Sequence, residues 1–389
     1  MTFINAKIYT MSKNIVFENG FISFKNGLIE KVGPMSEYSP TDDEIEPTID
    51  YSNTGTVITP GLIDAHCHAG MCEDGVGFEG DDGNEDTDPF TPHLRSIDAI
   101  NLFDRSFEEA LAAGITTVVS GPGSSNPIGG QMTALKTGGN LDDRIISSPL
   151  AMKMALGENP KITYHIKNQG PVTRMAIAAV IREGLKKAKR YTNDLKASKK
   201  DADIDEPEYD IKLDALAEVI KGLPIHIHAH RSDDILTALR LKDEFNLNMT
   251  IVHATDAHLI TEAVARAKVP VLIGPLLTDR SKPEMKNLTA ASAGILNKAK
   301  IKLAIVTDHP ETPLKYLPIC AALAVKEGLD YHEALKSITV NAAQICGFKN
   351  LGVLKAGYIA DIAVFNGDPI DIQKKAIKVI IGGKEVYNV

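Results

Sequence analysis

The stretch from Val57 to His68, VITPGLIDAHCH, indicates the fold, because an apolar run passes through a Pro-Gly turn and ends in two histidines two residues apart. On a strand this spacing directs both imidazoles to one face, where they can bind one metal ion. Three further apolar runs end in residue types that bind metal: LPIHIHAH at 223–230, MTIVHATDAH at 249–258 and KLAIVTDHP at 302–310. Parallel barrels carry their chemistry at the C-terminal ends of the strands. The residues predicted to meet there are His66, His68, His228, His253 and Asp308.

The pattern between these runs predicts an α/β fold. Apolar runs alternate with helical patterns, such as those at 98–113, 233–245 and 258–268, as expected for a (β/α)8 TIM-like barrel. The eight runs are Ile58 to Asp64, Ile115 to Ser120, Met132 to Lys136, Leu150 to Leu156, Pro224 to His230, Met249 to His253, Pro270 to Ile273 and Leu303 to Thr307.

Both ends of the chain show short apolar runs broken by turns, which is typical of β-structure. We predict that residues 1–56 and 352–389 together form a small β-sandwich domain, beside a barrel made by residues 57–351. The charged segment at 182–212 is expected to be a solvated projection on the barrel rim.

Composition agrees with a soluble enzyme. The chain has 389 residues, of which 43% are hydrophobic, enough to bury a large core. A net charge of −9 and the absence of Trp argue against nucleic-acid binding. No apolar run reaches membrane-spanning length, and the N-terminus lacks the pattern of a signal peptide, so we expect a cytoplasmic protein with no membrane partner. The four cysteines form no Cys-x-x-Cys pair and are expected to be free thiols.

Further motifs occur in a fixed order, including AGITTVVSGPGS at 113–124 and the closing run from Thr339 to Pro369. With these and the histidine-bearing runs, the chain resembles the metal-dependent amidohydrolase superfamily, in the branch of imidazolonepropionase and the prolidase-like dipeptidases. The resemblance covers nearly the whole chain. The chain also resembles an uncharacterised subgroup of this superfamily, in the motifs SGPGSSNPIGGQ, MKMALGENPK and HAHRSDDIL. This second resemblance does not indicate which reaction is catalysed. Members of the superfamily form oligomers, so a homo-oligomer is expected here.

The resemblance implies a role for each histidine. His66 and His68 would bind the more buried metal, and His253 would be the ligand from the sixth strand. The fifth strand has a histidine at every second position, and they share one face. The family motif places the metal ligand at the first histidine of His-Ala-His, which is His228. His230 would then lie further out, towards substrate, as a catalytic residue, while His226 lies deeper and is expected to be a core residue.

Lys153 lies inside an apolar run, where an unpaired ammonium would cost several kcal/mol. This superfamily often bridges two metals with a carboxylated lysine from the fourth strand, which makes Lys153 the bridging candidate. Glu158 is the substitute if the strand register differs. Alternatively, the Lys153 ammonium reaches solvent or pairs with an acid.

The chemistry implied is hydrolysis of an amide, peptide-like or cyclic amide C–N bond. A divalent metal, most plausibly zinc given the histidines, would make hydroxide available at neutral pH. Asp308 would bind metal and pass a proton to the leaving nitrogen. The alternatives are a mononuclear deaminase or imidazolonepropionase-like ring opening, and an inactive barrel that acts as an assembly scaffold. Deaminases usually carry a glutamate after the fifth-strand histidine, where this chain has only Asp233 and Asp234.

Three residues are candidates for contact with a small-molecule substrate. Arg231 and Arg174 could each bind a substrate carboxylate, although ordinary salt bridges on the rim are an equal alternative. The acidic segment at 73–95 follows the first strand closely and could act as a lid that carries His93, or be a solvated loop. The loop at 120–131 could line the pocket with backbone donors, and it lacks the phosphate-loop signature.

Overall fold

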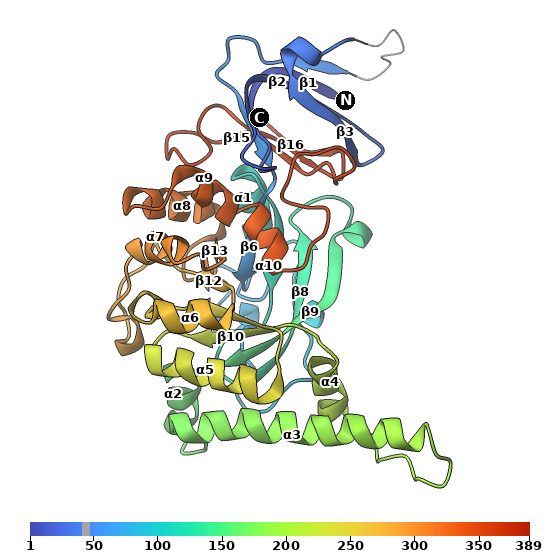
Figure 1. Ribbon diagram of the computed structural model, residues 1–389, viewed down its shortest axis with the longest axis vertical. Coiled ribbons are helices and arrows are strands. Elements are labelled where there is room, and N and C mark those ends of the chain that lie inside the picture. Colours follow the sequence, from blue (N-terminus) through green and yellow to red (C-terminus); the bar gives the residue numbers. More distant parts are fainter. Residues whose placement is uncertain (41–46) are drawn as a thin grey trace.

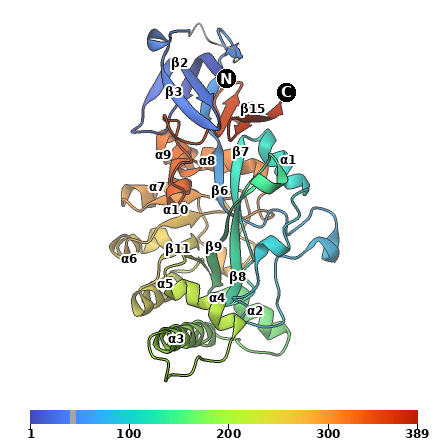
Figure 2. The same ribbon diagram turned by 90° about the vertical axis from the view of Figure 1, so that its right-hand side faces the viewer.

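The computed structural model describes residues 1–40 and 47–389, which form two eight-stranded sheets. One sheet curves into a nearly closed barrel at the centre of the molecule and is surrounded by helices (Figure 1). The other is built from both ends of the chain and lies at one end of the molecule, with the two termini close together (Figure 2). The predicted architecture, a barrel plus a β-structure made by the termini, is confirmed.

The barrel sheet follows chain order from β6 to β13. Its strands are β6 (Leu62–Cys67), β7 (Ile115–Ser120), β8 (Ile128–Lys136), β9 (Ile145–Ala155), β10 (Ile225–Ala229), β11 (Met249–His253), β12 (Val271–Ile273) and β13 (Leu303–Ile305). Strands β9 to β13 pair in parallel, and so do β6 and β7. Inward-facing apolar residues such as Ile63, Val252 and Leu272 pack together inside the barrel.

Strand β8 departs from the parallel pattern, because it pairs antiparallel with both β7 and β9. The prediction treated Met132 to Lys136 as the third strand of a regular (β/α)8 barrel. Only residues 121–127 and 137–144 connect β8 to its neighbours. A parallel connection needs a crossover of a dozen or more residues, usually a helix, so these short loops force the chain to reverse direction.

The helices cover the outside of the barrel (Figure 1). They are α1 (Arg105–Ala112), α2 (Glu158–Ile166), α3 (Arg174–Ser198), α4 (Ile211–Ile220), α5 (Ser232–Phe245), α6 (Thr261–Ala267), α7 (Ala291–Lys298), α8 (Leu317–Lys326), α9 (Tyr331–Ser337) and α10 (Val340–Ile345). The charged segment at 182–212 continues α3 to Ser198 and then leaves the helix, at the end of the molecule opposite the termini. In the described part of the chain, no helix is both long and apolar enough to span a membrane.

The terminal sheet has the order β16-β15-β14-β5-β1-β2-β3, with β4 paired to β1. Its strands are β1 (Thr2–Tyr9), β2 (Val16–Lys25), β3 (Leu28–Pro34), β4 (Thr48–Asp50), β5 (Val57–Pro60), β14 (Ile362–Phe365), β15 (Ala376–Ile381) and β16 (Lys384–Asn388). Phe3, Phe24 and Ile58 belong to its core. The boundaries of this part as a separate domain stay a prediction.

The two sheets meet in the run that was predicted as the first barrel strand. The structure divides this run, because Val57–Pro60 pairs in the terminal sheet and Leu62–Cys67 begins the barrel. Gly61 lies between the two strands, where a Cβ would stand 2.2 Å from Oγ1 of Thr116. A glycine therefore allows the chain to pass directly from one sheet to the other.

Candidate metal centre

The first group of candidate ligands comes from the ends of β6 and β13. Nε2 of His66 lies 3.4 Å from Oδ1 of Asp308, and Nε2 of His68 lies 3.3 Å from the same oxygen. Two ligand atoms on one tetrahedral zinc ion stand about 3.3 Å apart, given bonds of about 2.0–2.1 Å. The three side chains thus have the spacing of ligands to a single ion.

Two of the candidate ligands have an unusual backbone conformation. Asp308 has φ +54°, and His253, the last residue of β11, has φ +72°. Non-glycine residues in this left-handed region are uncommon and are concentrated at functional sites. Hydrogen bonds hold the end of β13 against β6, from His68 N to the His309 carbonyl at 2.8 Å and from Asp308 N to the His66 carbonyl at 3.2 Å.

The second group consists of His228, His230 and His253. The ring centroids are 4.7 Å apart for His228 and His230, 4.5 Å for His228 and His253, and 4.4 Å for His230 and His253. In each of the two groups, the possible ligand atoms lie within 4.8 Å of one another. His230, which was predicted to lie further out as a catalytic residue, is therefore placed within reach of the same ion as its neighbours.

Lys153 lies beside the first group. It points into the barrel from β9, it is only 1% exposed, and its Nζ is 2.9 Å from Nε2 of His66. The alternative in which its ammonium reaches solvent is excluded by this burial. Burial lowers the pKa of Lys153 to about 8, so the neutral amine is accessible near physiological pH.

The protonation of the histidines fits metal binding. Burial lowers the pKa of His66, His228 and His230 well below the usual value, and that of His253 to about 4. The imidazoles are then neutral, which is the form that offers a lone pair to a metal. Two of them, His66 and His228, have a buried Nδ1 with no hydrogen-bond partner among the described residues. Neutral histidines, a carboxylate and a buried amine are a donor set that suits a divalent transition metal.

Comparison with known proteins agrees with this geometry. The sequence model of the amidohydrolase family matches residues 57–386, most of the chain. The chain belongs to the amidohydrolase family.

Relatives of this amidohydrolase include a solved structure, the amidohydrolase from Thermotoga maritima MSB8, with 38% identity, a TM-score of 0.94 and complete coverage of both chains. Amidohydrolase tasK from Hapsidospora irregularis is 31% identical over 399 residues, which cover 95% of this chain and 40% of the relative. The chain thus spans about two fifths of that protein's length. Imidazolonepropionase from Idiomarina loihiensis is 23% identical over 393 residues, covering 93% of this chain and 90% of the relative. The predicted family is confirmed.

A pocket of about 410 Å³ opens onto the candidate metal centre of this amidohydrolase. Its walls include His68, His228, His230 and Asp308 from the centre itself. The loop after β7 contributes Gly123, Ser124 and Ser125, as predicted, and the acidic segment at 73–95 contributes Asp81, Gly83 and Asn84. The other polar residues of the lining include Asn159, Thr163, Ser281, Lys282 and Glu311. The pocket has the size of a small-molecule site.

The three residues proposed to contact substrate, and Glu158 as the alternative bridge, lie outside this pocket lining. Arg174 binds both carboxylate oxygens of Asp234 at 3.0 Å, and Arg231 binds those of Asp233 at 3.0 and 2.9 Å. The two arginines line a different cavity, together with Glu158. Their alternative interpretation as salt-bridge residues fits the structure. His93 and Glu158 also do not line the pocket at the metal centre.

Two acidic residues of the site were missed from the sequence. Asp64 is fully buried and accepts hydrogen bonds from the backbone N–H groups of His66 and Thr307, both at 3.1 Å, so it ties β6 to the end of β13. Burial raises the pKa of Asp64 to about 7. Its position two residues before His66 was the available signal.

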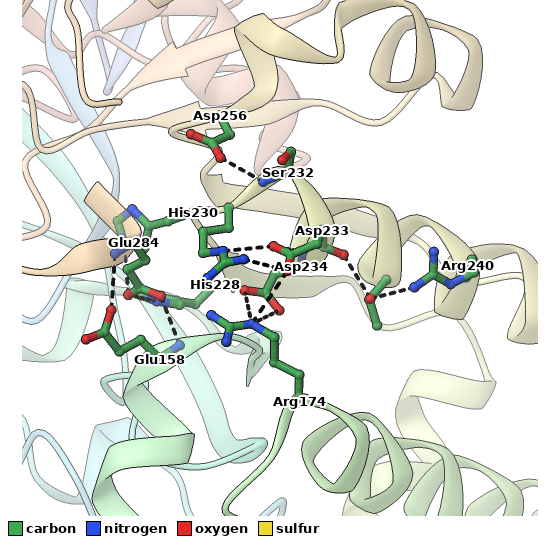
Figure 3. A network of polar contacts seen from close by, with 12 residues as sticks. Glu158, Arg174, His228, His230, Ser232, Asp233, Asp234, Arg240, Asp256 and Glu284 are labelled. Carbon is green, nitrogen blue, oxygen red and sulfur yellow. Dashed lines mark hydrogen bonds and ion pairs between the residues drawn. The ribbon is translucent and has the colours of Figure 1, made fainter. Parts of the chain in front are cut away.

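The second missed residue, Glu284, belongs to a short 3-10 helix, η6 (Pro283–Met285), and lies between His228, His230 and Glu158 (Figure 3). Its Oε1 is 3.4 Å from Nε2 of His228 and 3.7 Å from Nε2 of His230. Burial alone would raise the pKa of Glu284, but His230 and Lys282 lower it below the usual value. No periodic pattern surrounds this residue in the sequence, so nothing there marks it.

Proposed function

We propose that this chain is a metal-dependent hydrolase of the C–N bond in a small amide, peptide-like or cyclic amide substrate. The observation that carries the proposal is that two groups of candidate metal ligands lie close together, with one buried lysine against the first group. His66 of the first group and His253 of the second have ring centroids 5.9 Å apart, and Lys153 lies against His66. Family membership supports hydrolysis as the reaction class.

Lys153 is proposed to carry the bridge between the two groups. Its neutral amine would add carbon dioxide and release one proton, which converts a buried cation into a carboxylate with two oxygens. This removes the cost of an unpaired ammonium in the barrel interior. In the described residues, no carboxylate lies within salt-bridge distance of Lys153, so the attraction of the more distant Asp308, which acts to raise the pKa of the lysine, offsets only part of that cost.

A divalent metal held by these residues, zinc by the preference of histidine ligands, would supply a Lewis acid and lower the pKa of water near neutrality. Asp308 is proposed to transfer the proton from the attacking water to the leaving group. Its Oδ1 stands at the floor of the pocket between His66 and His68, where it would accept the proton of the attacking water and return it to the leaving nitrogen. The histidines remain neutral and hold the centre in place.

The pocket lining narrows the substrate class. Lys282 is the one lysine or arginine among the residues that line the pocket. Its ammonium is held by Oδ1 of Asn159 at 2.9 Å and by Oε1 of Glu284 at 3.0 Å. N-acyl amino acids, dipeptides and lactams with a carboxylate match a pocket of this size with one fixed cation. Deamination is disfavoured, since Asp233 and Asp234, which follow the fifth-strand histidines, are bound to arginines outside the pocket.

The test combines metal content with turnover. The chain purified without chelator, from cells supplied with zinc or manganese, is expected to contain about two metal ions. It is then assayed for amine release from panels of N-acyl amino acids, dipeptides and lactams, with protein stripped of metal as the control. A folded protein that binds no metal would refute the proposal, and about one ion per chain would favour mononuclear chemistry.

A further inference from the structure

Three of the five histidines in the two candidate groups share a pattern in which the protein holds Nδ1. His66 differs, since its Nδ1 has no partner among the described residues and its Nε2 lies beside Lys153. Nδ1 of His68 contacts the Gly121 carbonyl at 2.6 Å, and Nδ1 of His253 contacts the Gly274 carbonyl at 2.7 Å. Nδ1 of His230 contacts Oγ1 of Thr255 at 2.7 Å. Outer partners of this kind select the tautomer and leave Nε2 free to bind a metal.

His228 has the reverse arrangement. Its Nε2 forms a long hydrogen bond of 3.4 Å to Oε1 of Glu284, while its buried Nδ1 has no partner in the described part of the chain. An ionised carboxylate can only accept, so Nε2 carries the hydrogen and the lone pair lies on Nδ1. A buried nitrogen lone pair without a donor is costly unless another group, such as a metal ion, takes it.

Glu284 is itself held by Glu158 and Lys282. It is completely buried, its Oε2 accepts the backbone N–H of Glu158 at 2.9 Å, and its own N–H donates to Oε2 of Glu158 at 3.1 Å. Its Oε1 also lies 3.0 Å from Nζ of Lys282. Gly157 makes room for it, since a Cβ there would be 2.8 Å from Oε2 of Glu284.

These contacts favour an outer role over direct metal binding. Both oxygens of Glu284 already have donors from the protein, and the group of ligand atoms within 4.8 Å of one another contains His228, His230 and His253 without Glu284. Figure 3 shows Glu284 beside His228 and His230, and the hydrogen bond goes to His228.

We propose that Glu284 is the positioning residue of His228, accepting the hydrogen of Nε2 and thereby directing the lone pair of Nδ1 to a metal ion. This inference rests on the proposed function, because it requires that the centre binds metal. Outer partners of metal-binding histidines typically contribute 10–100-fold to metal affinity, roughly. A carboxylate from the loop after β12 would thus set the metal affinity of a ligand on β10.

The test is a titration of metal-free protein with Co²⁺ alone, followed by equilibrium dialysis and visible absorption. Glu284→Ala is expected to weaken binding of the more weakly held ion by about 10–100-fold. Glu284→Gln, whose amide oxygen can still accept from His228, is expected to lose less. At saturating Co²⁺ both variants should show the wild-type absorption bands, because the ligand atoms are unchanged. Altered bands would identify Glu284 as a direct ligand and overturn the proposal.

A second pair of variants separates positioning from simple neutralisation of Lys282. Lys282→Met alone should bind Co²⁺ at least as tightly as the wild type, and the double variant Lys282→Met/Glu284→Ala should remain weak. Recovery of wild-type affinity in the double variant would show that Glu284 acts only as the counter-ion of Lys282. Circular dichroism of the metal-free proteins checks folding. If Glu284→Ala does not fold, Glu284→Gln replaces it in both the single and the double variant. Wild-type protein that binds no Co²⁺ would refute the proposed function instead.

Discussion

Nζ of Lys153 lies 2.9 Å from Nε2 of His66, inside the barrel and away from solvent. A buried lysine in this position, next to candidate metal ligands, is explained if its amine is carboxylated when metal is present. The pKa of Lys153, lowered to about 8 by burial, means that a neutral amine is available for this reaction in a sizeable fraction of molecules near pH 7 to 8.

Replacing Lys153 should remove one metal ion. In Lys153→Met the bridging carboxylate cannot form, so metal content is expected to fall from about two ions per chain to about one, measured by elemental analysis. Wild-type protein loaded with ¹³C-bicarbonate and zinc should show a carbamate carbon signal that Lys153→Met lacks. Two metal ions in a folded Lys153→Met protein would contradict the bridge.

Asp308→Asn should lower turnover strongly with little change in the fold. Loss of a positioned acid–base group typically costs about 10²–10⁴ in rate, and the amide also binds metal more weakly. The measurement is kcat on the best substrate found, with metal content determined in parallel. His93→Ala, outside the pocket, is the matched control and should stay within about twofold of the wild type. Equal activity of Asp308→Asn and wild type would exclude Asp308 as the proton carrier.

Arg174 should matter for stability and not for substrate binding. Its guanidinium binds the nearly buried carboxylate of Asp234, so Arg174→Met leaves that charge unpaired and is expected to lower the free energy of unfolding by about 1–3 kcal/mol. Urea unfolding measures this loss, and Arg174→Met/Asp234→Asn should recover part of it. A raised KM for a carboxylate substrate with unchanged stability would restore the substrate role that the sequence suggested.

The cysteines should react slowly at moderately alkaline pH. The structure shows four free thiols, and burial raises the pKa of Cys320, Cys346 and the partly exposed Cys72 to about 12. Because a raised pKa keeps the reactive thiolate scarce below that pH, only about one molecule in 10⁴ carries it at each site at pH 8. Ellman's reagent should therefore label native protein much more slowly than denatured protein, which should show four thiols. Rapid labelling of the native protein would contradict this.

Much of the centre was predictable, because its main residues stand at the ends of apolar strands. The period of two along a strand places His66 and His68 on one face, and the structure brings them within reach of Asp308. Lys153 was marked by its charge inside an apolar run. These signals are local in the sequence, so no knowledge of distant contacts was required to find them.

Other features depended on partners that are distant in the chain. Arg174 and Arg231 have the chemistry to bind a substrate carboxylate, but folding places aspartates 234 and 233 against them. The direction of β8 depends on the lengths of the two loops that flank it. An apolar run predicts a strand but not the direction of that strand in the sheet.

The sequence by itself determined the family, the barrel and the candidate ligands at the strand ends, since each strand's own residues carry the pattern of burial and the metal-binding side chains. Only the tertiary structure decided which carboxylate supports which histidine. Glu284 reaches Nε2 of His228 across 56 residues of chain, from a loop without periodic pattern. Such a contact depends on where the folded backbone places two side chains, and neither residue's neighbours in the sequence carry that information.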